Sequence, residues 1–245
     1  MKLSDKVKAL IDSGAEPLVL HYEPVRFFQT AETLVRTSLV VNSLELGTLT
    51  MQEYRFVARR TKQGDRLVER HLIKLCREIP RLLEGGLKVT SFTVPVYARL
   101  LRDGLLAKML LETFALFPSV KPSLLCIELS ADILYEDVED AAARIAELRS
   151  LGVRVAICEV GDEFCPVFRL ASFHFDYAFL DSYAIAALGT DAAERVAGSL
   201  ATYLHLLRVK VVAPGLATEE LRTAAEAVGC DGYTVTVRDG EGVAS

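Results

Sequence analysis

The sequence predicts an α/β protein folded as a (β/α)8 barrel. Short runs of β-branched residues alternate with longer amphipathic segments at roughly one unit per 25–30 residues, which is typical of parallel strands joined by crossover helices. The later strands are apolar almost throughout, as expected for strands that are buried on both faces. About eight such strands in a chain of 245 residues match the size of this barrel. A doubly wound open sheet is the alternative architecture.

The composition excludes several classes of protein. Apolar residues make up 51% of the chain and charged residues 25%, so a sizeable core can form and a mainly disordered chain is excluded. The net charge of −5 and the lack of a Lys/Arg-rich run argue against a nucleic-acid-binding surface. The apolar runs are too short to span a membrane, and no signal peptide is recognised. The five cysteines show no paired spacing, which predicts reduced thiols in a cytoplasmic protein.

Eight segments have the composition of strands. The first two are rich in β-branched residues, and the later ones are short and nearly all apolar. All are expected to pair in parallel. They cover residues 18–25, 33–44, 88–94, 124–129, 153–160, 177–180, 209–213 and 233–237.

Helices are predicted where apolar residues recur at three- and four-residue spacing. Gly152 is expected to end one of them, and Thr218 to begin the last, with Glu219 and Glu220 in its first turn. An amphipathic helix is also expected at the N-terminus. The predicted helices cover residues 1–16, 63–83, 103–117, 136–151, 166–171, 191–207 and 218–228.

In a barrel of this kind, residues at the carboxyl ends of the strands carry the chemistry. Two strand ends offer firm metal ligands, the carboxylates of Glu128 and Glu159. A catalytic divalent ion needs several converging oxygen ligands, so two are few for metal-dependent hydrolysis. The sequence contains no phosphate-binding glycine loop, nucleophile elbow or common zinc motif. His71 and His205 fall inside predicted helices and are expected at the surface or its boundary.

Sequence motifs at successive strands resemble those of one family. In order they are HYEPV (21–25), ELGTLTMQEY (45–54), SFTVP (91–95), LLCIELSAD (124–132), LRSLGVRVAICEVGDEF (148–164), FDYAFLD (175–181), VKVVAPGLATEEL (209–221) and GCDGY (229–233). They are similar to motifs of the EAL domain, the family of bacterial cyclic-di-GMP phosphodiesterases. The resemblance extends over nearly the whole chain and implies a TIM-like barrel of the EAL type.

The resemblance also implies what hydrolysis would need. A hydrolytic EAL domain holds two Mg²⁺ or Mn²⁺ ions with carboxylates, an Asn and a Gln, and places a Lys near the attacking water. Glu128 is kept, and Glu159 stands where the family has an Asp. Because the other positions lack the oxygen ligands for two ions, no metal, no cofactor and no phosphodiesterase activity are expected. Those positions hold Arg36 (or Ser38, if the register shifts by two), Thr93, Cys158, Phe179 and Pro214.

Two roles are compatible with such a degenerate barrel. The main expectation is a regulatory module that acts by direct contact with a regulatory or sensory protein. The alternative is a receptor that binds cyclic-di-GMP without cleaving it, with Arg36 as the contact to phosphate. A weakly active phosphodiesterase is the second alternative. For the receptor, the candidate binding residues are Glu23, Arg36, Leu39, Glu128 and Glu159.

The aromatic segment after the fifth predicted strand is expected to include a protein interface. Phe164, Phe168 and Phe173 are its candidate contact residues, because the segment is more apolar than a strand and a loop require. A homodimer or a complex with another protein is expected there, without direct binding of nucleic acid or membrane. A single, stand-alone degenerate domain is expected over residues 1–245, with a tail over 238–245.

Overall fold

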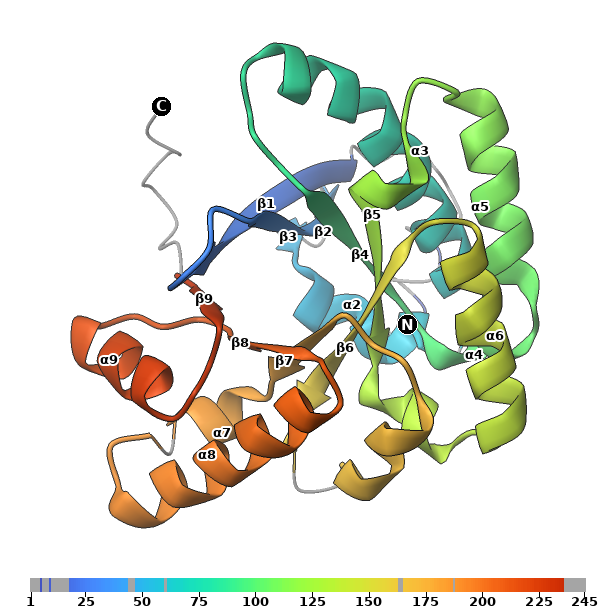
Figure 1. The fold of residues 1–245 in the computed structure, drawn as a ribbon. Helices are drawn as coiled ribbons and strands as arrows, with labels where there is room; N and C mark the ends of the chain where they lie inside the picture. The colour runs from blue at the N-terminus through green and yellow to red at the C-terminus, as the bar shows by residue number, and fades with distance from the viewer. Residues whose placement is uncertain are drawn as a thin grey trace.

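The strands form a closed barrel, and the helices surround it (Figure 1). The strands are β1 Leu18–Phe27, β2 Thr33–Ser43, β3 Gly47–Leu49, β4 Ser91–Val96, β5 Leu125–Ser130, β6 Arg154–Val160, β7 Tyr177–Leu180, β8 Lys210–Ala213 and β9 Gly232–Thr234. The computed structural model describes residues 18–43, 47–59, 61–162, 165–186 and 188–235, together with Asp5 and Ala9. The helix predicted over 1–16 and the tail over 238–245 otherwise lie outside the described residues.

The helices follow the strands around the outside of the barrel. The α-helices are α2 Met51–Ala58, α3 Lys62–Glu84, α4 Ala98–Arg102, α5 Leu105–Leu116, α6 Val138–Ser150, α7 Ser182–Ala186, α8 Asp191–Leu206 and α9 Glu219–Ala227. Three short 3-10 helices are also described: η1 Pro122–Leu124, η2 Ala131–Tyr135 and η3 Val167–Ser172. No helix in this part of the chain is long and apolar enough to cross a membrane.

Within the described residues, eight strands close the ring in the order β1, β2, β4, β5, β6, β7, β8 and β9. Neighbours from β2 round to β9 are parallel, whereas β1 is antiparallel to both β2 and β9. The eight-stranded barrel is therefore confirmed, but the prediction of parallel pairing throughout is wrong for β1. Residues 28–32 alone connect β1 to β2, and a parallel crossover needs a much longer connection, so the two strands form a hairpin.

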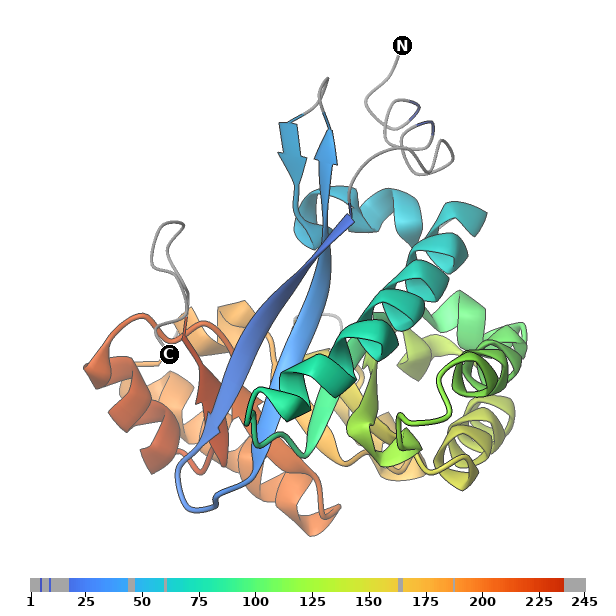
Figure 2. The ribbon, with the colours of Figure 1, turned by 90° about the horizontal axis from the view of Figure 1, so that it is seen from above.

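Two elements between β2 and α3 are absent from the sequence prediction. The short strand β3 pairs with the outer end of β2, and this hairpin extends beyond the barrel (Figure 2). The helix α2 begins after Thr50, whose backbone N–H donates to the Glu53 side chain at 2.7 Å. This capping interaction starts α2 beside the rim of the barrel, where the helix contributes to the site described below.

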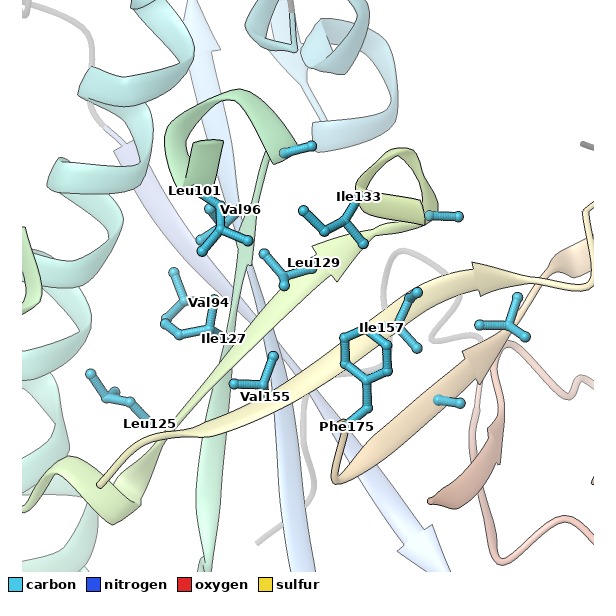
Figure 3. Packing of buried hydrophobic residues seen from close by; sticks show 14 of the residues in the cluster. Val94, Val96, Leu101, Leu125, Ile127, Leu129, Ile133, Val155, Ile157 and Phe175 are labelled. Carbon is cyan, nitrogen blue, oxygen red and sulfur yellow. The ribbon is translucent and has the colours of Figure 1, made fainter. Parts of the chain in front are cut away.

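Alternation along each strand separates the two faces of the barrel wall. On β5, Leu125, Ile127 and Leu129 pack outward with residues of β4 and β6 (Figure 3). Glu128 occupies the opposite face, because successive side chains of a strand point to opposite sides. The inward face also holds a small apolar cluster: Val25, Leu34, Cys126, Ala156, Tyr177, Phe179 and Val212. Glu128 therefore points into the barrel above an apolar plug.

Two predicted helix ends, at Gly152 and Thr218, are confirmed. Gly152 has a φ of 91° just after α6, a conformation that glycine adopts without strain. The hydroxyl of Thr218 accepts a hydrogen bond from the backbone N–H of Leu221 at 3.3 Å, so it caps α9.

Candidate functional site

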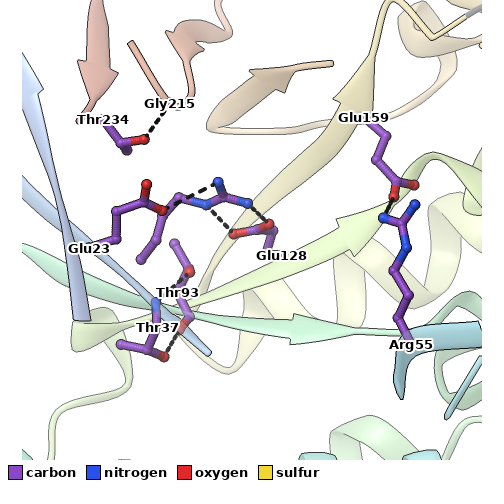
Figure 4. A network of polar contacts seen from close by, with 9 residues as sticks. Glu23, Thr37, Arg55, Thr93, Glu128, Glu159, Gly215 and Thr234 are labelled. Atoms are coloured by element: carbon purple, nitrogen blue, oxygen red, sulfur yellow. Dashed lines mark hydrogen bonds and ion pairs between the residues drawn. The ribbon is translucent and has the colours of Figure 1, made fainter. Parts of the chain in front are cut away.

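Arg36 and Glu128 form an ion pair inside the barrel. Nε of Arg36 donates to Oε2 of Glu128 at 3.1 Å, and Nη2 of Arg36 donates to Oε1 (Figure 4). The Glu128 side chain is 2% exposed and the Arg36 side chain 20%. Two hydrogen bonds to one guanidinium offset the cost of removing this carboxylate from water.

Two further side chains surround the guanidinium of Arg36. Glu23 lies directly opposite Arg36 in the β1–β2 ladder, and its Oε2 is 3.8 Å from Nη1. The guanidinium also lies over the ring of Phe179, 4.2 Å from the ring centroid. Burial alone lowers the pKa of Arg36, but the charges of Glu128 and Glu23 outweigh burial and raise that pKa above its ordinary value. Arg36 is therefore a permanent cation between two carboxylates and an aromatic ring.

Cys158 lies close enough to this ion pair for its charges to act on the thiol. Burial raises the pKa of Cys158 well above its ordinary value, and the negative charges of Glu128 and Glu159 raise it further. The positive charge of Arg36 acts in the opposite direction but does not cancel the shift. At neutral pH the group is a thiol rather than a thiolate, and it is the thiolate that ligates metals and attacks substrates.

A buried bridge holds β2 against β4 beside Arg36. The backbone N–H of Thr37 donates to Oγ1 of Thr93 at 3.3 Å, and the Thr37 hydroxyl donates to the Thr93 carbonyl. The same hydroxyl lies 2.7 Å from Nε2 of His71 on α3. His71 is only 2% exposed, so its prediction at the surface or its boundary is wrong. Burial lowers the pKa of His71 to about 3, so its ring is neutral.

Glu159 belongs to a second network at the rim of the barrel. Its Oε1 is 2.5 Å from Nη1 of Arg55 on α2 (Figure 4), and its Oε2 is 3.0 Å from Nη2 of Arg59, the residue directly after α2. Arg59 also lies 2.8 Å from Asp132. Glu159 has a φ of 62°, which is strained for a residue with a side chain. The pairing register between β6 and β7 shifts between Ile157 and Val160, and the Glu159 side chain is turned toward α2. Figure 4 shows Glu159 apart from Glu128.

Several predicted site residues are therefore not assembled with Arg36. Leu39 is 2% exposed in the outer core, and its carbonyl accepts the Tyr54 hydroxyl at 2.8 Å, so the prediction that it lines the binding site is wrong. Pro214 is half-buried directly after β8. The next residue, Gly215, donates its N–H to Oγ1 of Thr234 at 2.9 Å. Thr93 is fully buried and is used in the bridge to Thr37.

The sequence prediction missed Thr37, His71, Arg55 and Arg59. Arg55 and Arg59 carry a recognisable signal, because residues four apart on a helix share one face. His71 also carries one, since it lies four residues after Leu67 and four before Leu75, both of which are buried. Thr37 carries no such signal, because its role depends on its position just past the paired residues of β2 and β4, which a single sequence does not reveal.

The aromatic segment is divided between core and surface. Phe173 is 8% exposed and packs against Phe175, with ring centroids 5.9 Å apart, so the prediction that it contacts a partner is wrong. Phe168 on η3 is 86% exposed, and its ring meets Tyr203 of α8 edge-on at 6.3 Å. Phe164 lies outside the described residues.

Among the residues that the structure describes, no three His, Cys, Asp or Glu side chains gather as a metal site. The two acidic residues at the Arg36 site face a guanidinium, and Glu159 faces two more. A divalent ion placed at this site would meet a fixed positive charge and an occupied carboxylate. The donor set therefore does not fit a pair of divalent ions.

Comparison with known proteins identifies relatives over the barrel. The sequence model of one protein family, described as the EAL domain, matches residues 8–234. An uncharacterized signaling protein of Caulobacter vibrioides is 30% identical over 102 residues, which is 41% of this chain and 13% of that protein. An uncharacterized protein of Mycobacterium tuberculosis is 28% identical over 98 residues, which is 40% of this chain and 16% of that protein. The matched part is thus less than a fifth of the length of these curated relatives.

Solved structures share the fold at low sequence identity. The PaMucR phosphodiesterase, in its complex with c-di-GMP, superposes with a TM-score of 0.83 at 21% identity, covering 96% of this chain and 95% of the other. The FimX EAL domain from Pseudomonas aeruginosa bound to c-di-GMP gives a TM-score of 0.82 at 13% identity, covering 98% of this chain and 96% of that one. These likenesses show a common TIM-like barrel of the EAL type.

Proposed function

The chain belongs to the EAL domain family, and from this we propose that it is a cyclic-di-GMP signalling protein that does not hydrolyse the dinucleotide and acts by contact with another protein. One observation carries the first half of the proposal. Arg36 donates hydrogen bonds to both carboxylate oxygens of Glu128, the acidic residue that the resemblance aligns with a family metal ligand. A guanidinium supplies charge but has no acceptor and cannot activate a water, so it does not replace a metal in hydrolysis.

Hydrolysis is tested directly with the purified protein, cyclic-di-GMP and Mn²⁺. We expect no linear dinucleotide above the background set by the Glu128→Gln variant, because neither protein has the ligands for the two divalent ions that would activate a water. The PaMucR phosphodiesterase serves as the active control. Turnover comparable to that enzyme, abolished by Glu128→Gln, would overturn the proposal.

Protein contact is supported by the apolar surface around Phe168. Phe168 is 86% exposed beside Tyr203, and the neighbouring helix α8 exposes Val196 at 70% and Leu206 at 78%. Exposed apolar groups gathered in this way are typical of interaction surfaces. We expect Phe168→Glu to remove the native partner from affinity capture in the host and to lower any self-association measured by sedimentation.

A matched variant separates this surface from general effects of added charge. Leu111 on α5 is also exposed, at 55%, and Leu111→Glu makes the same chemical change elsewhere. We expect the Leu111→Glu protein to retain the captured partner and the mass of the wild type. Loss of partner in both variants, or in neither, would contradict an interface at Phe168.

The second candidate function is a receptor that binds cyclic-di-GMP without cleaving it. The Arg36 side chain is 20% exposed, so part of it is accessible inside the barrel. The structural neighbours PaMucR and FimX were solved with c-di-GMP bound. A guanidinium binds phosphate oxygens well. Calorimetric titration with and without EDTA tests this function. Micromolar binding that is insensitive to EDTA and lost in Arg36→Met would favour the receptor function. Absence of binding would favour a module that acts through protein contact alone.

A further inference from the structure

The helix α3 carries a line of cations along its solvent face. At about 100° per residue, six basic residues fall within an arc of about 120° that extends along about 28 Å of helix. Most of the buried residues of α3, among them Val68, Leu72, Leu75 and Ile79, lie on the opposite side. We call the six residues the α3 basic stripe: Lys62, Arg66, Arg70, Lys74, Arg77 and Arg81.

Asp65 and Glu78 of α3 lie outside the arc of this stripe and contact other residues, whereas Glu69 lies at its border. Asp65 pairs with Arg99 of α4. Glu78 accepts the hydroxyl of Tyr22 on β1 at 2.5 Å and lies 3.3 Å from Lys74. Glu84 falls within the arc, at the last turn. Arg66 and Arg70 make polar contacts of their own, so the stripe acts as a whole face and not through one isolated cation.

We propose that the α3 basic stripe is a docking surface for an acidic segment of another protein, a helix that presents Glu or Asp at matching three- and four-residue spacing. Four of the six cations are arginines, which bind carboxylates through two parallel hydrogen bonds. Spacing that repeats along a rigid helix selects a partner whose charges repeat in the same way. The surface lies on α3, away from Phe168 on η3, so it stands whether or not the proposed function holds.

Charge balance favours a short acidic segment over a long polyanion. The whole chain has a net charge of −5, so the residues outside the stripe carry −11. A nucleic-acid duplex or an anionic bilayer extends beyond the stripe, onto a protein whose other residues carry a net negative charge, whereas a single helix covers the stripe alone. The apolar face of α3 is buried in the core, so the helix has none to insert into a membrane.

The test uses two double variants with the same change in charge. Arg77→Glu with Arg81→Glu reverses two cations of the stripe, and Lys108→Glu with Lys121→Glu reverses two exposed cations elsewhere. The probe is a labelled helical peptide with Glu at matching spacing, compared by fluorescence anisotropy with a scrambled peptide of the same composition. Duplex DNA and vesicles of phosphatidylserine and phosphatidylcholine are the alternative probes. Thermal unfolding verifies that both variants fold.

We expect the matched peptide to bind the wild type and to bind the Arg77/Arg81 variant about tenfold more weakly, since two attractive ion pairs become repulsive. The Lys108/Lys121 variant should retain binding, and added salt should weaken it. Equal loss in both variants, equal binding of the scrambled peptide, or absence of binding would overturn the proposal. Tighter binding of DNA or vesicles than of the matched peptide would overturn the choice of partner.

Discussion

The hydroxyl of Thr37 lies 2.7 Å from Nε2 of His71 and donates its own proton to the Thr93 carbonyl. Since that proton is used, the Thr37 oxygen accepts from His71, and His71 donates from Nε2. The geometry therefore assigns the neutral tautomer protonated at Nε2. A second proton would place a charge where the ring is 2% exposed, which agrees with the lowered pKa of His71.

This histidine is predicted to make the protein less stable in mild acid. The pKa of His71 is about 3 in the folded protein and has an ordinary value of 6.5. Above 6.5 neither the folded nor the unfolded state takes the proton, and stability is unaffected. Below 6.5 the unfolded state binds it and the folded state does not, so the free energy of unfolding falls as the pH falls toward 3. At about pH 5 the loss amounts to about 2 kcal/mol.

Urea unfolding at neutral pH and at about pH 5 measures this loss. Other groups also titrate in this range, so the comparison with His71→Gln isolates the histidine. Glutamine keeps an N–H donor for Thr37 but does not titrate. We expect the acid-induced loss to be smaller in His71→Gln by about 2 kcal/mol. Equal losses in the two proteins would show that His71 is protonated in the folded state.

The ion pair inside the barrel makes Arg36 important for stability. Arg36→Ala leaves the Glu128 carboxylate, 2% exposed, without its counter-charge. We expect a loss of about 2–4 kcal/mol, somewhat below the value for a fully buried pair because Arg36 is itself 20% exposed. Chemical unfolding at neutral pH measures the change.

Two comparisons show whether that loss comes from the uncompensated charge. Arg36→Met with Glu128→Leu removes both charges, and it should recover most of the lost stability. Arg144→Ala breaks an exposed pair with Glu147, 3.2 Å apart, and should cost less than about 1 kcal/mol. If the double variant is as unstable as Arg36→Ala, packing and not charge explains the loss.

Backbone strain at Glu159 can be separated from its ion pairs by two substitutions. Both Glu159→Ala and Glu159→Gly remove the contacts with Arg55 and Arg59, but only glycine relieves the φ of 62°. Glu159→Gly should therefore be more stable than Glu159→Ala by about 1 kcal/mol in thermal or chemical unfolding. A more stable alanine variant would mean that the backbone relaxes once the arginines are released.

Much of the fold is predictable because it depends on local periodicity. The segment LCIELS predicts a strand with Glu128 on one face and leucine and isoleucine on the other, and β5 has this arrangement. The direction of β1 is not a local property, because it depends on the short connection over residues 28–32. The elements β3 and α2 are short, so their signal is weak in a single sequence.

The site is less predictable, because it depends on ion pairs between residues that are far apart in the sequence, and the strand pattern does not indicate which residues pair. Arg36 and Glu128 are 92 residues apart, and only the closed ring brings them together. The resemblance puts Glu159 in the site, where the family has an Asp, but the register shift and its pairs with Arg55 and Arg59 turn it away. The α3 basic stripe escapes a search for contiguous cations, since its members are three or four residues apart.

Arg208 occupies a backbone conformation that favours glycine. It follows the last residues of α8 with a φ of 61°, and its N–H donates to the carbonyl of His205 at 2.8 Å. Helices commonly end on a residue of this conformation, which costs energy for any residue with a side chain. We predict that Arg208→Gly raises the free energy of unfolding by about 0.5–1 kcal/mol, the strain relieved being larger than the entropy that glycine adds to the unfolded chain.

The matched control places the same glycine two residues earlier. Leu206 is 78% exposed, so Leu206→Gly loses little packing, but it lies within α8, where glycine is unfavourable. Leu206→Gly should therefore lower stability by about 0.5–1 kcal/mol, opposite in sign to Arg208→Gly. Thermal unfolding at one pH compares both with the wild type. A loss of stability in Arg208→Gly would mean that contacts of the arginine side chain outweigh the strain in its backbone.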